Sequence, residues 1–312
     1  AHGVATDVTD GIPSVDELLA GRLDSFVRVT PRAGSLGVYV YDETAGAEVY
    51  SYCADSLMSP ASNMKMLTCI AAIRKLGPNY CFESGAYVCG EMNGDTLVGD
   101  IALKFTFDPW LDNAKMAQLA DAFSRRGIRR VSGRVVIDLQ MREPMTHEEH
   151  WTIGDMKVRR LSMLYRGEQR MLSEVKYALR SHGVSITDNQ VVVARVPKGA
   201  VKVGATLTPL RHSVERALMN SSNEHAECLS FAMSGMFLQG QDFRGAATQY
   251  LRHFIGREFG IDADVVSRIH DGCGLCVQDK LTPRFLVWML HYAYTHKYIY
   301  QMLRWYLPVS GT

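Results

Sequence analysis

The chain has 312 residues, 47% of them hydrophobic, and its 34 Lys and Arg against 33 Asp and Glu leave a formal net charge of +1. This length allows two domains that each bury a core. The balanced charge argues against nucleic acid and strongly anionic membranes as partners, and no run approaches the roughly 18 to 20 apolar residues of a transmembrane helix.

Three elements are predicted before residue 80. Apolar residues recur at helical spacing from Val15 to Arg28, which predicts a helix that packs on a sheet. Alternation from Ser35 to Tyr50 around a glycine-containing turn predicts a β-hairpin. A further helix is predicted to begin near Pro60 and to end before Gly77-Pro78, so that Ser62 lies in its first turn.

Between Tyr80 and Pro209 the pattern changes to short strands with two helices between them. We expect strands at 84–89, 101–107, 131–138 and 190–196, and helices at 113–126 and 167–182. Long helical patterns return at 210–238, 245–259 and 283–296. The middle region is interpreted as an inserted α+β unit, because it separates the two stretches that carry the candidate chemistry.

The first of these stretches contains Ser62 and, three residues further along the same helix, Lys65. This spacing places an amine beside a hydroxyl that needs a base before it can act as a nucleophile. Lys65 must then be neutral part of the time, which burial and the positive end of the helix favour. The amide of Ser62 is one donor for a developing oxyanion. Taken alone, the pattern also fits a solvated helix face.

The second stretch is Ser221-Ser222-Asn223. A hydroxyl at Ser221 can relay a proton to a leaving nitrogen, and the amide of Asn223 can bind a substrate backbone. The alternative interpretation is a helix-capping cluster. His225, in the following helix, is a candidate cleft residue or else a packed or exposed helix position. A functional interpretation of both stretches requires that folding brings Ser62, Lys65, Ser221 and Asn223 into one cleft.

With these motifs the chain resembles the class C low-molecular-mass penicillin-binding proteins, the D-alanyl-D-alanine carboxypeptidase/endopeptidase family. The similarity holds in order and spacing over nearly the whole chain. Beyond the two motifs it includes Gly99–Leu111, Gly127-Ile128, Gly133–Asp138, Ala226-Glu227, Asp271–Leu275, Thr282-Pro283 and Leu307–Thr312.

The resemblance implies an α+β fold. Residues 1–79 and 205–312 are expected to form a β-lactamase/transpeptidase-like domain, an antiparallel sheet flanked by helices, and residues 80–204 an inserted accessory domain. The inserted region is short for the family.

The resemblance also implies a serine D,D-peptidase that cleaves D-alanyl-D-alanine or D-alanyl cross-link bonds in peptidoglycan stem peptides through an acyl-enzyme. In that scheme Lys65 deprotonates Ser62, Ser221 passes the proton to the departing D-alanine, and Asn223 holds the substrate amide. β-Lactams are expected to inhibit covalently, no cofactor is required, and export to the periplasm or cell envelope is implied.

Four residues are assigned to substrate binding on the same basis: Asp271, Gly272, Cys273 and His225. Two alternative functions stay open. One is a β-lactamase, although no suitably placed Glu for deacylation is evident. The other is a catalytically impaired peptidoglycan-binding scaffold.

The chain also departs from the family pattern. The third family motif, Lys-Thr-Gly, does not occur in the sequence, which ends at Thr312. We expect truncation, and with it the loss of strands that complete the sheet, more than an evolved loss.

Two further patterns raise the question of a metal. Cys273 and Cys276 stand where the family shows serines, and the pair is read as plain substitution, since a zinc site needs two more ligands. His147-Glu148-Glu149-His150 has its histidines three apart instead of four, and is read as a polar loop. The sequence therefore predicts no metal site.

Overall fold

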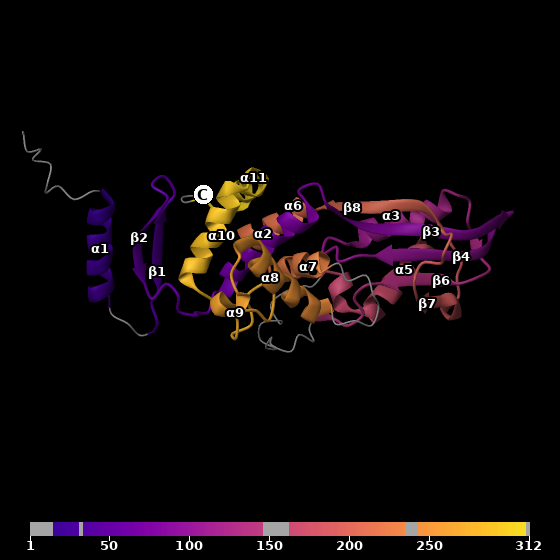
Figure 1. The fold of residues 1–312 in the computed structure, drawn as a ribbon. Coiled ribbons are helices and arrows are strands. Elements are labelled where there is room, and N and C mark those ends of the chain that lie inside the picture. The colour runs from indigo at the N-terminus through magenta and orange to yellow at the C-terminus, as the bar shows by residue number, and fades with distance from the viewer. Residues whose placement is uncertain (1–14, 31–33, 146–161, 235–242, 310–312) are drawn as a thin grey trace, which may run out of the picture.

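A computed structural model describes residues 15–30, 34–145, 162–234 and 243–309. The molecule is elongated, with a hairpin and its flanking helices at one end, a group of helices in the middle and a larger sheet at the other end (Figure 1). This is the α+β class that the sequence predicts, with a sheet flanked by helices.

The hairpin end consists of two strands between two helices. Strands β1 and β2 pair antiparallel, α1 packs against β2, and α10 packs against β1 (Figure 1). The bounds are α1 Val15–Val29, β1 Val38–Asp42, β2 Ala47–Tyr52 and α10 Pro283–Thr295. The predicted N-terminal helix and hairpin are both present.

Helix α2 (Met64–Leu76) lies at the centre of the helical group. It contacts α6, α7, α8, α10 and α11, and nearly every residue in its first ten is buried. A helix that is apolar on all sides packs inside a core. Lys65, which lies in the first turn of α2, is therefore buried together with its apolar neighbours. The other elements here are α6 Leu210–Met219, α7 Asn223–Met233, α8 Phe243–Phe259, α9 Ala263–Val266, α11 Lys297–Tyr306, β9 Ser267–Arg268 and β10 Lys280–Leu281.

The larger sheet has the strand order β7-β6-β4-β3-β8, and β5 also pairs with β4. Strand β3 is antiparallel to β4 and β8, whereas β4, β5, β6 and β7 pair in parallel. Helix α3 packs on β3 and β8, and α5 packs on α3. The bounds are β3 Cys81–Asn93, β4 Thr96–Phe105, β5 Arg130–Val131, β6 Val135–Leu139, β7 Val191–Val193, β8 Val201–Pro209, α3 Asn113–Ser124 and α5 Glu168–Ser181, with 3-10 turns at Leu164–Arg166 and Asp188–Gln190.

The larger sheet is mixed, and the sequence analysis predicted no strand direction for this region. Two other details differ from the sequence prediction. Strand β8 was not predicted, since its alternation is interrupted by the small residues Gly204 and Ala205. The single helix expected over 210–238 is two helices, because the backbone turns at Ser221.

The limits of the predicted inserted domain, 80–204, stay a prediction, although the sheet continues through β8 to Pro209. The pattern at 147–150 lies outside the described residues. Within the described ranges, no helix is both long and apolar enough to cross a membrane.

Candidate active site

Ser62 lies in a short 3-10 turn, Ala61–Asn63, that leads directly into α2. Its side chain is exposed, whereas Met64 and Lys65 immediately after it are buried. Ala61 has φ of 44°, a left-handed conformation that is costly for a residue with a Cβ. Such strain persists only where the surroundings enforce it, and it marks this turn as a candidate functional segment.

Lys65 extends back along α2 to the hydroxyl of Ser62. Its Nζ donates a hydrogen bond to Ser62 Oγ over 3.0 Å and another to the carbonyl oxygen of Cys273 over 2.7 Å. The side chain is only 2% exposed. Burial disfavours the charged form of an amine, so the position suits a lysine that must give up its proton.

Ser221 meets Ser62 from the break between α6 and α7. The two hydroxyl oxygens are 2.6 Å apart, and either can donate. Ser221 has φ of 50°, so it too is held in the left-handed region. Ser222 then caps α7 by accepting from the His225 amide, and Asn223, which is half-buried, is the first residue of that helix. The capping interpretation is therefore correct for Ser222, while Ser221 contacts Ser62.

The loop from Asp271 to Cys276 closes the site beneath Lys65. The Asp271 carboxylate accepts from the amides of Cys273, Gly274 and Cys276 over 2.9, 2.5 and 2.8 Å. Thr68, one helical turn beyond Lys65, donates to the carbonyl oxygen of Gly272 over 2.6 Å. These bonds turn the Cys273 carbonyl toward Lys65.

Helix α7 holds the same loop through Glu227, whose Oε1 accepts from the Gly272 amide over 2.7 Å. Possible ligand atoms of Glu227, Asp271 and Cys273 lie within 4.8 Å of one another, all buried. Burial and the two neighbouring carboxylates raise the pKa of the Cys273 thiol, whereas a metal ligand must be a thiolate. Both carboxylates accept hydrogen bonds from backbone amides. We therefore assign these three residues a structural role, which is to fix the conformation of the loop from Asp271 to Cys276.

His225 faces the sheet side of α7. Its Nδ1 is 2.8 Å from Ser222 Oγ, and its ring packs edge-on against Trp110 with centroids 5.4 Å apart. Its Nε2 is buried and has no hydrogen-bond partner among the described residues. Burial, and secondarily the Arg216 guanidinium, lowers the pKa of His225 to about 4. The imidazole is therefore neutral at neutral pH.

The lowered pKa of His225 predicts a loss of stability in mild acid. An unfolded histidine protonates near pH 6.5, but the folded one does so only near pH 4. As the pH falls through this window the unfolded state binds the additional proton, so unfolding should become easier by roughly 2 kcal/mol between pH 8 and pH 5. Urea denaturation at both pH values, compared with His225→Gln, measures this difference. An equal pH dependence in the variant would contradict it.

The structure thus brings Ser62, Lys65 and Ser221 into hydrogen-bond contact, with Asn223 two residues beyond and the Cys273 carbonyl on Lys65. Asp271 and Gly272 make their printed hydrogen bonds to other residues of the same chain. Their predicted role in substrate binding stays a prediction, and so does that of Cys273 and His225. Thr68 and Glu227 were not identified from the sequence as site residues. The position of Thr68, on the α2 face that carries Lys65, is a signal that could have found it.

Comparison with known proteins gives a consistent set of relatives. The model of the D-Ala-D-Ala carboxypeptidase 3 (S13) family matches residues 19–162 and 160–312. A D-alanyl-D-alanine carboxypeptidase of an Actinomadura strain is 34% identical over 104 residues, which are 33% of this chain and 19% of that protein. The carboxypeptidase DacB of Haemophilus influenzae is 23% identical over 126 residues, 40% of this chain and 26% of that protein. The matched regions therefore span about a quarter of these relatives or less.

Solved structures share the fold over most of the chain. The crystal structure of penicillin-binding protein 4 (dacB) from Haemophilus influenzae aligns with a TM-score of 0.75 and 16% identity, covering 89% of this chain and 79% of that one. The same protein complexed with a β-lactam aligns with a TM-score of 0.71 and 17% identity, covering 88% and 78%. At this identity the likeness establishes the fold, which agrees with the predicted α+β class.

Proposed function

Because the chain belongs to the D-Ala-D-Ala carboxypeptidase 3 (S13) family, we propose that it is a serine D,D-peptidase that cleaves D-alanyl-D-alanine or D-alanyl cross-link bonds in peptidoglycan stem peptides. One observation carries the proposal beyond the family assignment. The Ser62 hydroxyl lies between an amine at 3.0 Å and a second hydroxyl at 2.6 Å. This is the arrangement that acyl transfer to a serine requires.

The reaction can be written on these groups. Lys65 Nζ, in its neutral form, takes the proton of Ser62 as Oγ attacks the carbonyl carbon of the penultimate D-alanine. The Ser62 amide, at the start of the helix, is one donor to the oxyanion. Ser221 then gives its hydroxyl proton to the departing D-alanine nitrogen and takes one from protonated Lys65 in exchange, and Asn223 binds the substrate amide. Water hydrolyses the ester in the second half.

The relatives support this choice of substrate and inhibitor. Both curated relatives carry the name D-alanyl-D-alanine carboxypeptidase, and the structural relative has been crystallised with a β-lactam. We extend these properties to this chain: stem peptides as substrates, β-lactams as acylating inhibitors and no cofactor. Action on the cell wall also implies export to the periplasm or cell envelope.

Intact-mass spectrometry after incubation with benzylpenicillin tests the proposal. The expected result is a mass increase of one penicillin molecule on the unmodified sequence and none on Ser62→Ala. Ser173→Ala is a matched control, because Ser173 is an exposed serine on α5 that only bonds its own helix, at Gln169 O. It should acquire the adduct normally.

The outcome also separates the alternative functions. A long-lived adduct supports a peptidase, and an adduct hydrolysed within seconds indicates a β-lactamase. Complete absence of an adduct on the folded protein would favour a catalytically impaired scaffold and overturn the proposal.

A further inference from the structure

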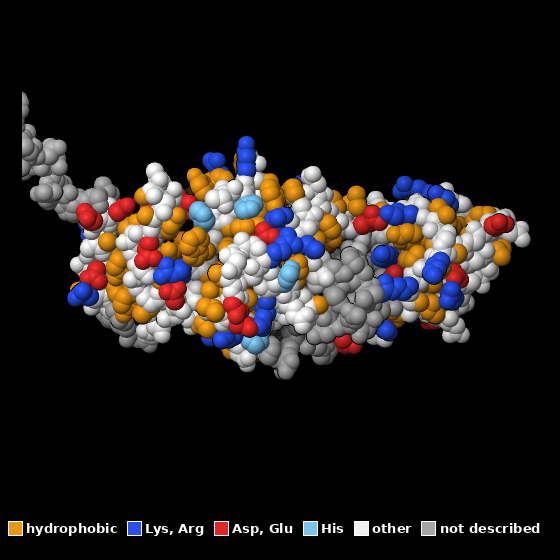
Figure 2. Space-filling model, viewed as in Figure 1, with side chains coloured by type: hydrophobic (Ala, Val, Ile, Leu, Met, Phe, Trp, Pro, Cys, Tyr) orange, Lys and Arg blue, Asp and Glu red, His pale blue; other side chains and the backbone are white. Residues whose placement is uncertain are grey.

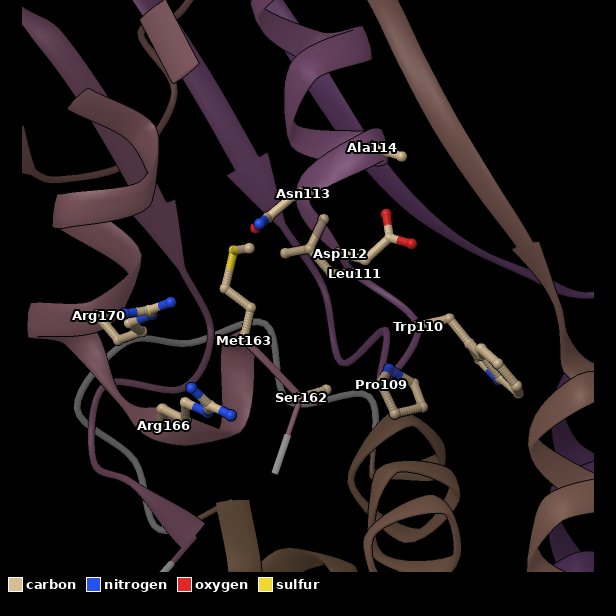
Figure 3. A pocket seen from close by; sticks show the side chains of 10 residues that line it. All are labelled: Pro109, Trp110, Leu111, Asp112, Asn113, Ala114, Ser162, Met163, Arg166 and Arg170. Atoms are coloured by element: carbon tan, nitrogen blue, oxygen red, sulfur yellow. The ribbon is translucent and has the colours of Figure 1, made fainter. Parts of the chain in front are cut away.

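Acidic side chains in the described part of the chain commonly lie near basic ones. Figure 2 shows this on one face of the surface, where Asp and Glu side chains lie next to Lys and Arg side chains at several points. The cavity in Figure 3 has Asp112 in its wall as well as Arg166 and Arg170. Asp108 is fully buried, and it bonds Lys115 Nζ over 3.0 Å. A second fully buried aspartate, in the loop after β9, has another acid beside it instead.

This second aspartate is Asp279, which immediately precedes β10 at the end of the loop that connects β9 to it. Its Oδ1 accepts a hydrogen bond from the His270 amide over 2.7 Å, and its own amide donates to the carbonyl oxygen of Cys276 over 3.1 Å. The first of these bonds joins the two ends of the loop. The same loop contains the Cys273 carbonyl that accepts from Lys65.

The other oxygen of the same carboxyl group, Oδ2, is buried and has no hydrogen-bond donor among the described residues. Beside Asp279 lies the carboxyl group of Asp271, whose oxygens accept from the amides of Cys273, Gly274 and Cys276. An unpaired charge buried beside a second carboxylate is costly. A proton on Asp279 removes that charge and makes its carboxyl group a hydrogen-bond donor to Asp271.

The surroundings of Asp279 favour this protonated form. Burial, and secondarily the charge of Asp271, raises the pKa of Asp279 to about 8, although the His270 amide opposes the shift. The ionisable side chains on the loop and on α7, α2, β9 and β10 around it are Asp271, Cys273, Cys276, His270, Glu227, Lys65, Arg268 and Lys280. The amines of Lys65 and Lys280 donate to backbone carbonyls, those of Cys273 and Val277.

We propose that Asp279 is a positioning residue for the acylation of Ser62, because its protonated carboxyl group donates to Asp271 and so fixes the loop that presents the Cys273 carbonyl to Lys65. An ionised Asp279 would repel Asp271, which holds the amide of Cys273 itself. The acceptor of Lys65 would then move. This role rests on the proposed function, in which Lys65 is the base.

The pH dependence of acylation tests this role. Intact mass follows adduct formation between benzylpenicillin and Ser62 at pH 7 and at pH 9, in the unmodified protein and in Asp279→Asn. The asparagine oxygen can accept from the His270 amide, and its NH2 group can donate to Asp271 at either pH. The aspartate, with a pKa of about 8, is only about one-tenth protonated at pH 9. Relative to Asp279→Asn, the unmodified protein should therefore lose about tenfold in rate from pH 7 to pH 9.

The comparison of two proteins separates Asp279 from Lys65, whose own titration changes the rate of both. Asp264→Asn is the matched control, because Asp264 is an exposed aspartate on the neighbouring helix α9 that pairs with Arg252. This variant should keep the loss of rate at pH 9, and thermal melting verifies that both variants fold. A ratio of rates between the unmodified protein and Asp279→Asn that is the same at both pH values overturns the positioning role.

Infrared difference spectra read the proton on Asp279 without any acylation. The spectrum of the unmodified protein minus that of Asp279→Asn should contain the C=O stretch of a protonated carboxyl group at pH 7, and this band should be much weaker at pH 9. Absence of the band at pH 7 overturns the positioning role even where the adduct forms. Failure of the proposed function is read separately, from the absence of a penicillin adduct on the unmodified protein.

Discussion

A Lys65→Met variant is expected to form the Ser62 adduct with benzylpenicillin about a thousandfold more slowly than the unmodified protein. Methionine is also unbranched and only one atom shorter, so it fits a site that is 2% exposed, but it cannot take a proton. Removing a positioned general base typically costs two to four orders of magnitude in rate. The measurement is the rate of adduct formation, followed by intact mass at a fixed penicillin concentration.

The control for this variant is Lys75→Met, on the same helix. Lys75 is exposed and lies over the ring of Tyr250, at 5.4 Å from its centroid, away from Ser62. It should acylate at the normal rate. Lys65→Met also leaves the Cys273 carbonyl without its donor, which costs roughly 1 to 3 kcal/mol of stability. A folded Lys65→Met protein that acylates within tenfold of the unmodified rate would show that Lys65 is not the base.

The contact between Ser62 and Lys65 could be predicted because it is local. Residues three apart on a helix are neighbours whatever the rest of the fold does. Ser221, which contacts Ser62, lies 159 positions further along the sequence. That contact became predictable only through the resemblance to a family in which the two motifs share one site. The start of helix α2 just after Ser62 was likewise readable from Pro60, and its end from Gly77-Pro78.

The features that were not predicted depend on backbone paths. Glu227 binds a backbone amide 45 positions away, and any carboxylate in reach would satisfy that amide, so residue type alone gives no signal. The left-handed backbone at Ala61 and Ser221 could not be predicted either. Glycine in a sequence often indicates a positive φ, whereas alanine and serine do not. Strand β8 was missed since its small residues weaken the alternation on which strand prediction depends.

A Gly274→Ala variant is expected to destabilise the protein by about 3 kcal/mol and to slow acylation of Ser62. Gly274 has φ of +78°, and a Cβ placed there would lie 1.8 Å from the carbonyl oxygen of Ala61. Ala61 immediately precedes Ser62, and Gly274 follows Cys273, whose carbonyl accepts from Lys65. Relief of the clash must therefore move either the serine or the acceptor of its base.

Gly127→Ala separates this steric effect from the cost of the backbone conformation. Gly127 has φ of +79°, but no atom lies within 4 Å of its added Cβ. Alanine should cost about 1 to 2 kcal/mol there from the left-handed backbone alone, with acylation unchanged. The excess loss at Gly274, measured by urea denaturation and penicillin kinetics on both variants, reports the contact with Ala61. If the two variants lose equal stability and acylate equally fast, the loop does not hold the Ser62 turn in place.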